Sequence, residues 1–203
     1  MRRARPSRSA STASTTSPEN PTVTASSPLP TVAHPTVRFM LSHPAHLIAL
    51  GFGSGLPRRA PGTVGTLWAW VAYLVMQLWL SPASIGWVIL ASLPIGWWAC
   101  TVTARHMNVA DPGHIVWDEV VAFWLILWLV MPAGLWAQVI AFALFRLFDA
   151  AKPGPVGWAD ALCKQKDATR DTMRWSVAGF GILFDDLVAA FCTLFVIALW
   201  RAW

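Results

Sequence analysis

The chain has 203 residues, of which 56% are hydrophobic and only 12% are charged. Soluble domains carry about twice that charged fraction. Fourteen tryptophans against one tyrosine also favour membrane residence, because tryptophan prefers the bilayer interface. The net charge of +5 does not indicate a nucleic-acid partner, since aromatic residues are not interleaved with basic ones as in single-strand binders. The three cysteines lack close pairing and metal-ligand spacing, so neither a disulfide framework nor a zinc site is implied.

The first 38 residues form an arm whose composition differs from the rest of the chain. The arm is rich in Ser, Thr, Pro and Ala, and its early arginines are not followed by the apolar core of a secretory signal peptide. Such a segment cannot bury enough apolar surface to offset its ordering entropy. We therefore predict a disordered arm over residues 1–38 and a membrane-embedded domain over residues 39–203. A true start at Met40 is the alternative.

Five apolar runs predict an all-α membrane bundle. The runs cover residues 67–80, 85–103, 120–131, 135–145 and 187–200. Only the second run approaches the ~20 residues of a straight membrane span. We expect an integral membrane bundle of about four to five short apolar helices, in which the shorter ones need polar ends, bilayer thinning or local re-entry.

The charges between these runs indicate one orientation. The connections 81–84 and 132–134 are short and uncharged, whereas every Lys and Arg except Arg201 lies before the first run or in the two longer connections. Positive residues concentrate on the cytoplasmic side of membrane proteins. If all five runs cross, the ten acidic residues share that side. The sequence thus predicts a multi-pass protein whose polar site faces the cytoplasm.

Three charged residues at the end of one apolar run are the first candidate site. Arg146, Asp149 and Lys152 follow at steps of three, and Pro153 cannot continue a helix. This spacing predicts that Arg146 lies beside Asp149, and Asp149 beside Lys152. Two cations flanking a carboxylate suit a phosphate next to a metal-bound carboxylate. The alternative for this stretch alone is an ion-pair ladder at a helix end.

Two acidic pairs, Asp118–Glu119 and Asp185–Asp186, stand where helices enter apolar segments. With Asp149 they make five carboxylates at helix mouths on one side, where ionisable groups are costly. Such carboxylates repel one another unless a cation lies among them, and Mg²⁺ is the expected cation because it prefers oxygen ligands. Adjacent helical residues point about 100° apart, so one of each pair is expected to face the metal. The alternative for each pair alone is capping of a helix N-terminus.

Residues 50–66 (LGFGSGLPRRAPGTVGT) are rich in glycine and proline. Dense glycines allow a row of peptide N–H groups to face an anion, and a helix starting near Thr63 would add its free N–H groups. We expect the backbone of Gly62 and Thr63 to bind phosphate. The alternative is a loop that only leads into a membrane helix, since the pattern is neither a dinucleotide-binding nor a Walker motif.

Five segments occur in a fixed order along the chain. They are residues 44–56 (PAHLIALGFGSGL), 61–67 (PGTVGTL), 115–119 (IVWDE), 145–155 (FRLFDAAKPGP) and 179–186 (GFGILFDD). Together they resemble the phosphatidylglycerophosphatase A family over about residues 43–200. The resemblance implies an all-α, Mg²⁺-dependent lipid phosphatase of the bacterial inner membrane. Such an enzyme converts phosphatidylglycerophosphate to phosphatidylglycerol and phosphate.

Four features depart from the family pattern, one of which is the N-terminal arm, since the family has no counterpart to it. Ala178 stands where the family usually has glycine, and Thr66 stands where it usually has serine. The stretch 160–176 looks longer and more basic than the family leads us to expect. None of these departures removes a carboxylate or a cation from the candidate site.

The resulting hypothesis is metal-assisted hydrolysis of a phosphomonoester. Arg146 and Lys152 would hold the phosphate oxygens, with the backbone of Gly62 and Thr63 as a further clamp. The residues expected to be catalytic, and to serve as metal ligands or their supporting partners, are Asp118, Glu119, Asp149, Asp185 and Asp186.

Two other classes of function fit parts of the pattern. A small cation-binding channel or transporter would place acidic residues deep within its spans, and cations beside them would obstruct the path. A purely structural membrane protein leaves the acid–base cluster unexplained.

Overall fold

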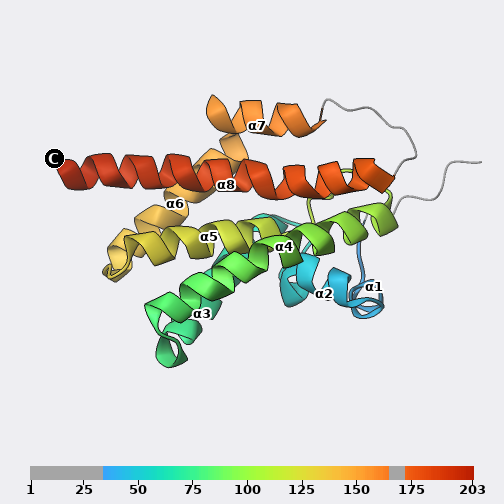
Figure 1. The fold of residues 1–203 in the computed structure, drawn as a ribbon, viewed down its shortest axis with the longest axis horizontal. Coiled ribbons are helices and arrows are strands. Elements are labelled where there is room, and N and C mark those ends of the chain that lie inside the picture. The colour runs from blue at the N-terminus through green and yellow to red at the C-terminus, as the bar shows by residue number, and fades with distance from the viewer. Residues whose placement is uncertain (1–33, 165–171) are drawn as a thin grey trace, which may run out of the picture.

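The computed structural model describes residues 34–164 and 172–203, and every regular element within them is helical (Figure 1). In chain order the elements are α1 (Val37–Leu41), α2 (Pro44–Ala49), the 3-10 helix η1 (Gly51–Gly53), α3 (Pro61–Trp79), α4 (Pro82–Met107), α5 (Trp117–Val130), α6 (Leu135–Ala151), α7 (Pro155–Lys164) and α8 (Thr172–Ala202). The all-α prediction is confirmed for this part of the chain. Residues 1–33 of the predicted arm lie outside the described residues, whereas residues 34–38 are described and α1 begins within them.

Prolines and caps set the helix boundaries. Pro61 and Pro82 occupy the first turns of α3 and α4, where a missing N–H costs no helical hydrogen bond. The side chain of Ser81 caps α4 by accepting from the Ser84 N–H at 3.2 Å. Helix α4 ends at Asn108 in the left-handed conformation, with φ of 56°, which asparagine tolerates better than most residues. Helix α3 begins at Pro61, two residues before Thr63, near which the sequence allows a helix start.

Helix α5 is the centre of the bundle. Helices α3, α4, α6 and α8 all pack against it, and Phe123, Ile126 and Leu127 are completely buried. An apolar sequence on every side of a helix is what burial in a core requires. Its 14 residues correspond to about 21 Å of helix. The charged residues in the first turn of α5 are therefore far from its C-terminal end.

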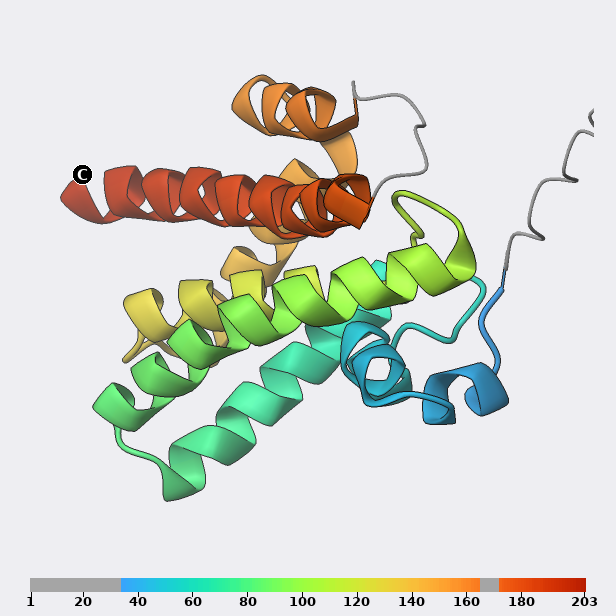
Figure 2. The same ribbon diagram turned by 45° about the vertical axis from the view of Figure 1, so that its right-hand side comes forward.

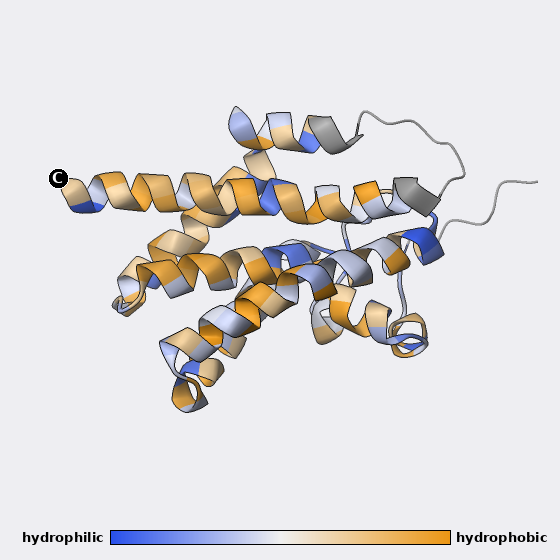
Figure 3. Ribbon diagram, viewed as in Figure 1, coloured by the Kyte–Doolittle hydropathy of each residue, from blue (hydrophilic) through white to orange (hydrophobic). Residues whose placement is uncertain are grey.

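Apolar residues are frequent along the surrounding helices (Figure 3), and some of their large apolar side chains are exposed. Val71, Leu90, Ile140 and Phe195, on four different helices, are each more than half exposed. Two helices in the described part of the chain, Pro82–Met107 and Trp175–Ala202, are long and apolar enough to cross a membrane. We predicted four to five membrane helices. Length and composition support a membrane crossing for two helices in the described part of the chain.

A second layer of short helices lies beyond the start of α5 (Figure 2). This layer contains α1 and α2. Helix α2 contacts the last turn of α4, where the His46 Nε2 and His106 Nδ1 atoms are 2.8 Å apart. The Val116 N–H, just before α5, donates to the Ala49 carbonyl at 2.9 Å. His114 Nδ1 lies 2.7 Å from the Gly55 carbonyl oxygen. These bonds fix the glycine-rich segment next to the first turn of α5.

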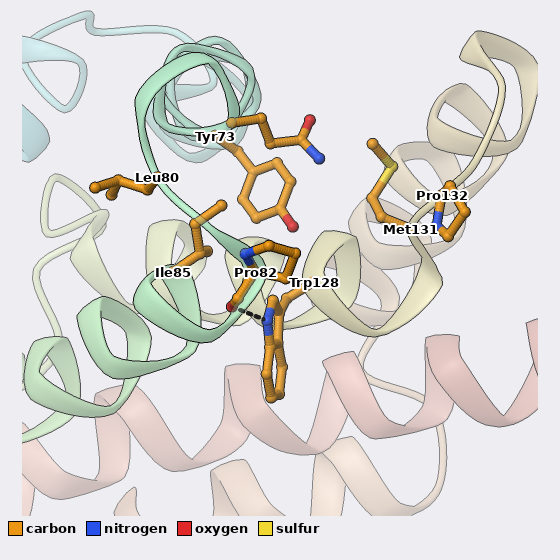
Figure 4. A pocket seen from close by; sticks show the side chains of 8 residues that line it. Tyr73, Leu80, Pro82, Ile85, Trp128, Met131 and Pro132 are labelled. Carbon is orange, nitrogen blue, oxygen red and sulfur yellow. Dashed lines mark hydrogen bonds between the residues drawn. The ribbon is translucent and has the colours of Figure 1, made fainter.

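A pocket of about 240 Å³ opens at the opposite end of the bundle (Figure 4). Tyr73, Ile85 and Trp128 are among its lining residues, and Trp128 Nε1 donates to the Pro82 carbonyl at 2.8 Å. The pocket borders the C-terminal end of α5, whereas Asp118 and Glu119 lie at its N-terminal end. It is therefore separate from the predicted polar site.

Candidate functional site

Three helices bring the five predicted carboxylates together. Asp118 and Glu119 lie in the first turn of α5, and Asp149 lies in the last turn of α6. The charges of the other four carboxylates all act on Asp186 of α8. The three helices thus place the five carboxylates within electrostatic reach of one another, and their role in binding a metal stays a prediction.

The position of Asp185 and Asp186 differs from the expected helix mouth. Both residues lie inside α8, about three and a half turns after Thr172. The sequence around Asp185 and Asp186 shows where an apolar run starts, but the helix begins earlier, in the more polar stretch that precedes it.

Arg146 is held by two carboxylates. Its Nη1 donates to Glu119 Oε1 at 3.0 Å and to Asp149 Oδ2 at 2.5 Å. The pairing with Asp149 is the one that the three-residue spacing predicts, whereas the bond to Glu119 joins α6 to α5. The Arg146 side chain is only 19% exposed, so a charged partner is needed to offset its loss of hydration.

Lys152 does not pair with Asp149 as its spacing predicts. It caps α6 in the left-handed conformation, with φ of 42°, and therefore leaves the helical row that contains Arg146. Its Nζ donates to Asp160 Oδ1 at 2.5 Å and to Asp185 Oδ2 at 2.6 Å. Burial alone would lower the pKa of Lys152, but these two carboxylates outweigh burial and raise it.

Asp160 is a site residue that sequence reasoning missed. It lies on α7, across the turn that follows Lys152. The signal for it was its position eight residues after Lys152, beyond a Pro-Gly-Pro turn. That spacing does not by itself predict a contact between Lys152 and Asp160. The contact depends on α7 folding back onto α8.

Glycines of α3 allow Glu119 to approach the helix closely. A Cβ atom on Gly62 would collide with Glu119 Oε1, and one on Gly65 would lie 3.0 Å from Glu119 Oε2. Ala60, which precedes α3, has a left-handed backbone and provides no side-chain cap. The first turns of α3 therefore lie against Glu119, and the binding of phosphate by the backbone of Gly62 and Thr63 stays a prediction.

The donor chemistry of the cluster suits a divalent cation held jointly with a phosphate. Glu119 Oε2 and Asp186 Oδ2 are buried and have no hydrogen-bond partner. Within residues 34–164 and 172–203, no three His, Cys, Asp or Glu side chains are grouped closely enough to hold a metal ion by themselves. Mg²⁺ commonly uses only one or two carboxylates together with substrate phosphates and waters. Such a site does not need three converging carboxylates before the substrate binds.

Charge and fold thus define a helical protein with an acidic site that three helices share and that holds two basic side chains. The chain belongs to the phosphatidylglycerophosphatase A family, whose sequence model matches residues 47–201. It is 37% identical over 158 residues to phosphatidylglycerophosphatase A of Escherichia coli (strain K12), covering 75% of this chain and 80% of that protein. It is 36% identical over 172 residues to phosphatidylglycerophosphatase A of Haemophilus influenzae, covering 84% and 96%. The resemblance seen in the five sequence motifs is confirmed, and the chain is a phosphatase by family.

A third relative carries a different name. The chain is 31% identical over 161 residues to a putative phosphatidylinositol-3-phosphatase of Bacteroides thetaiotaomicron, which covers 76% of this chain and 92% of the relative. No solved structure matches the chain. Both names are those of phosphatases that act on a phosphatidyl compound.

Proposed function

We propose that this protein hydrolyses the phosphomonoester of phosphatidylglycerophosphate, releasing phosphatidylglycerol and phosphate. The observation that carries the proposal is the placement of Arg146 and Lys152 among carboxylates from three helices. Two positively charged side chains can hold a phosphate dianion. The names of the relatives called phosphatidylglycerophosphatase A indicate which phosphate ester the substrate is.

The two cations would bind the phosphate by exchanging partners. Arg146 offers a planar fork of N–H donors, and Lys152 offers three hydrogens on a flexible stem. Phosphate oxygens would replace part of the carboxylate contacts that both side chains now make. The backbone N–H groups of Gly62 and Thr63 would add donors from the start of α3. These contacts would orient the phosphate ester towards the carboxylates.

The five carboxylates would supply the ligands of Mg²⁺ and the partners that support those ligands. Glu119 Oε2 and Asp186 Oδ2 support this assignment because a buried carboxylate oxygen without a partner is costly. The chemistry that Mg²⁺ supplies when bound is neutralisation of phosphate charge and a lower pKa for water. Glu119 and Asp149 also form ion pairs with Arg146. They can therefore orient the guanidinium group that would bind the phosphate.

We also propose that the protein is a multi-pass protein of the bacterial inner membrane. Exposed tryptophans gather at the far ends of the helices: Trp79, Trp87, Trp136, Trp200 and Trp203. A second exposed aromatic group, formed by Trp97, Trp98 and Phe180, lies towards the site. Along α8 the step from Phe180 to Trp200 corresponds to about 30 Å of helix. That length matches the hydrocarbon thickness of a bilayer of about 30 Å.

In this orientation the site would lie just inside the cytoplasmic headgroup level. Asp185 follows Phe180 by about 8 Å of helix. Arg58, Arg59 and Arg105 are exposed in the same half of the molecule as the site, and the positive-inside rule assigns that half to the cytoplasm.

A cation channel or transporter is a poorer fit. Arg146 and Lys152 are bonded directly to three of the five predicted carboxylates. Positive side chains in that position repel a cation that would have to pass along the carboxylates.

The test is phosphate release by the purified protein in detergent. Phosphatidylglycerophosphate and phosphatidylinositol 3-phosphate are each supplied with Mg²⁺, with and without an excess of EDTA. The proposal predicts Mg²⁺-dependent release that is faster from phosphatidylglycerophosphate. No release from that lipid would contradict the phosphatase assignment. Release that survives EDTA would contradict the metal, and faster release from the inositol lipid would contradict the substrate.

A further inference from the structure

Helix α7 is held against Lys152 at two points. Val156 and Ala159 are buried on the side of α7 that faces the bundle, whereas Trp158 is 62% exposed on the other side. A Cβ atom on Gly157 would collide with the Lys152 carbonyl oxygen, so α7 rests directly on the backbone that follows α6. Asp160, one turn further on, reaches the ammonium group of the same lysine.

The lysine ammonium is shared between two helices. Asp160 of α7 and Asp185 of α8 accept from Nζ at 2.5 and 2.6 Å. The lysine side chain is 29% exposed, against 20% for Asp160 and 11% for Asp185. Asp160 is thus the more solvent-accessible partner, and Asp185 is the one within the carboxylate cluster. An ammonium group has three hydrogens, so it can keep one carboxylate partner while it donates to another group.

We propose that Asp160 is a positioning residue for the substrate phosphate, acting through Lys152. This inference rests on the proposed function and deepens it, because it assigns the carboxylate that keeps the lysine at the edge of the site. Without Asp160, the flexible lysine stem leaves Asp185 as the ammonium's strongest anchor. The lysine would then neutralise a carboxylate that is needed beside the phosphate. With Asp160, a phosphate monoester can replace Asp185 as a partner while the ammonium stays in place.

The same contact has a purely structural reading, in which Asp160 only ties α7 to the bundle. The two readings predict different kinetics. A positioning residue for phosphate changes the concentration dependence for substrate and for inorganic phosphate, and its effect requires Lys152. A structural tie lowers thermal stability and the amount of active protein, and its loss adds to the loss of Lys152.

The experiment is a double-mutant cycle on full-length protein in detergent. Wild type is compared with Asp160→Ala, Asp160→Asn, Lys152→Ala and the Lys152→Ala/Asp160→Ala double variant. The control is Arg201→Ala, which removes a charged side chain where the end of α8 meets the end of α5. The measurements are KM and kcat on phosphatidylglycerophosphate with Mg²⁺, binding of inorganic phosphate by equilibrium dialysis, and thermal unfolding by tryptophan fluorescence.

The expected result for Asp160→Ala is a KM and a phosphate Kd raised by about tenfold, the scale of one hydrogen bond to a charged group. We expect kcat to change by less than about threefold. Asp160→Asn keeps an oxygen acceptor and should fall between Asp160→Ala and wild type. In the Lys152→Ala background, Asp160→Ala should change the phosphate Kd by less than about twofold.

Two results would overturn the proposal. One is an effect of Asp160→Ala that is equally large with and without Lys152. The other is a fall in kcat or in thermal stability with unchanged KM and phosphate Kd. If wild type releases no phosphate from the lipid, the proposed function fails, and the dialysis measurements still decide whether Asp160 controls phosphate binding through Lys152.

Discussion

The two cations of the site, Arg146 and Lys152, are held in different ways. Arg146 lies within α6 and bonds to a carboxylate on its own helix and to Glu119 of α5. Lys152 is the C-cap of the same helix, and its side chain bonds to carboxylates of later helices, Asp160 and Asp185. A residue inside a helix has neighbours that helical spacing fixes. A residue at the left-handed end of a helix has neighbours that the tertiary fold chooses.

The comparison predicts the largest loss of stability for Arg146→Ala. This variant leaves Glu119 and Asp149 without the cation that they share, and removing one partner of a buried ion pair costs about 3–5 kcal/mol. Thermal unfolding in detergent should show a lower midpoint for this variant than for Gly62→Ala, Lys152→Ala or Arg201→Ala, and phosphate release should be abolished. An unfolding midpoint equal to that of wild type would show that the arginine pairs are not important for the fold.

Gly62→Ala should disturb the same arginine centre from the other side. A methyl group there collides with Glu119 Oε1, and overpacking of this kind typically costs about 1–3 kcal/mol. Gly113→Ala is the matched control, because a Cβ on Gly113 meets nothing within 4 Å. Unfolding midpoints and phosphate release are measured for both. Equal behaviour of the two variants would contradict the close packing of α3 on Glu119.

Lys152→Ala should cost less stability than Arg146→Ala. Its two partners have side chains that are 20% and 11% exposed, and a lost charged hydrogen bond is typically worth about 1.5–3 kcal/mol before relaxation. The left-handed backbone at this position is unfavourable for alanine as it is for lysine, so the change in the unfolding midpoint reports the lost charge. An unfolding midpoint below that of Arg146→Ala would reverse the comparison.

Arg201→Ala tests a cation at the opposite end of the molecule. Its Nη2 donates to the Val130 carbonyl at 3.0 Å, which joins the end of α8 to the end of α5. Loss of this part-exposed bond should cost about 1 kcal/mol or less and leave phosphate release unchanged. A large loss of phosphate release would show that the two ends of the bundle are coupled.

The same contrast explains what the sequence could and could not predict. The helical class, the gathering of five carboxylates and the Arg146–Asp149 pair follow from apolar runs, from residue chemistry and from a spacing of three. The contact of Lys152 with Asp160 does not, because it depends on where α7 folds back after the turn. The interior position of Asp185 in α8 was also missed, since hydropathy marks where an apolar run begins and not where its helix begins.

The contacts of the glycine-rich segment could be predicted only in part. Its density predicted a close backbone approach to a charged group, and Gly62 and Gly65 do approach one. The group that they contact is the Glu119 carboxylate of the neighbouring helix. That partner depends on how α3 packs on α5, which the sequence does not specify. The contact of this backbone with phosphate stays a prediction.

The most direct test of the proposed site is Mg²⁺-dependent phosphate release from phosphatidylglycerophosphate by Asp149→Asn. Folding of this variant is checked by thermal unfolding beside wild type and Arg201→Ala, which removes a charged side chain at the opposite end of the bundle. We predict a folded Asp149→Asn protein whose kcat/KM falls by at least about a hundredfold, while Arg201→Ala keeps wild-type activity. Wild-type activity in folded Asp149→Asn would contradict a catalytic role for this carboxylate and for its pairing with Arg146.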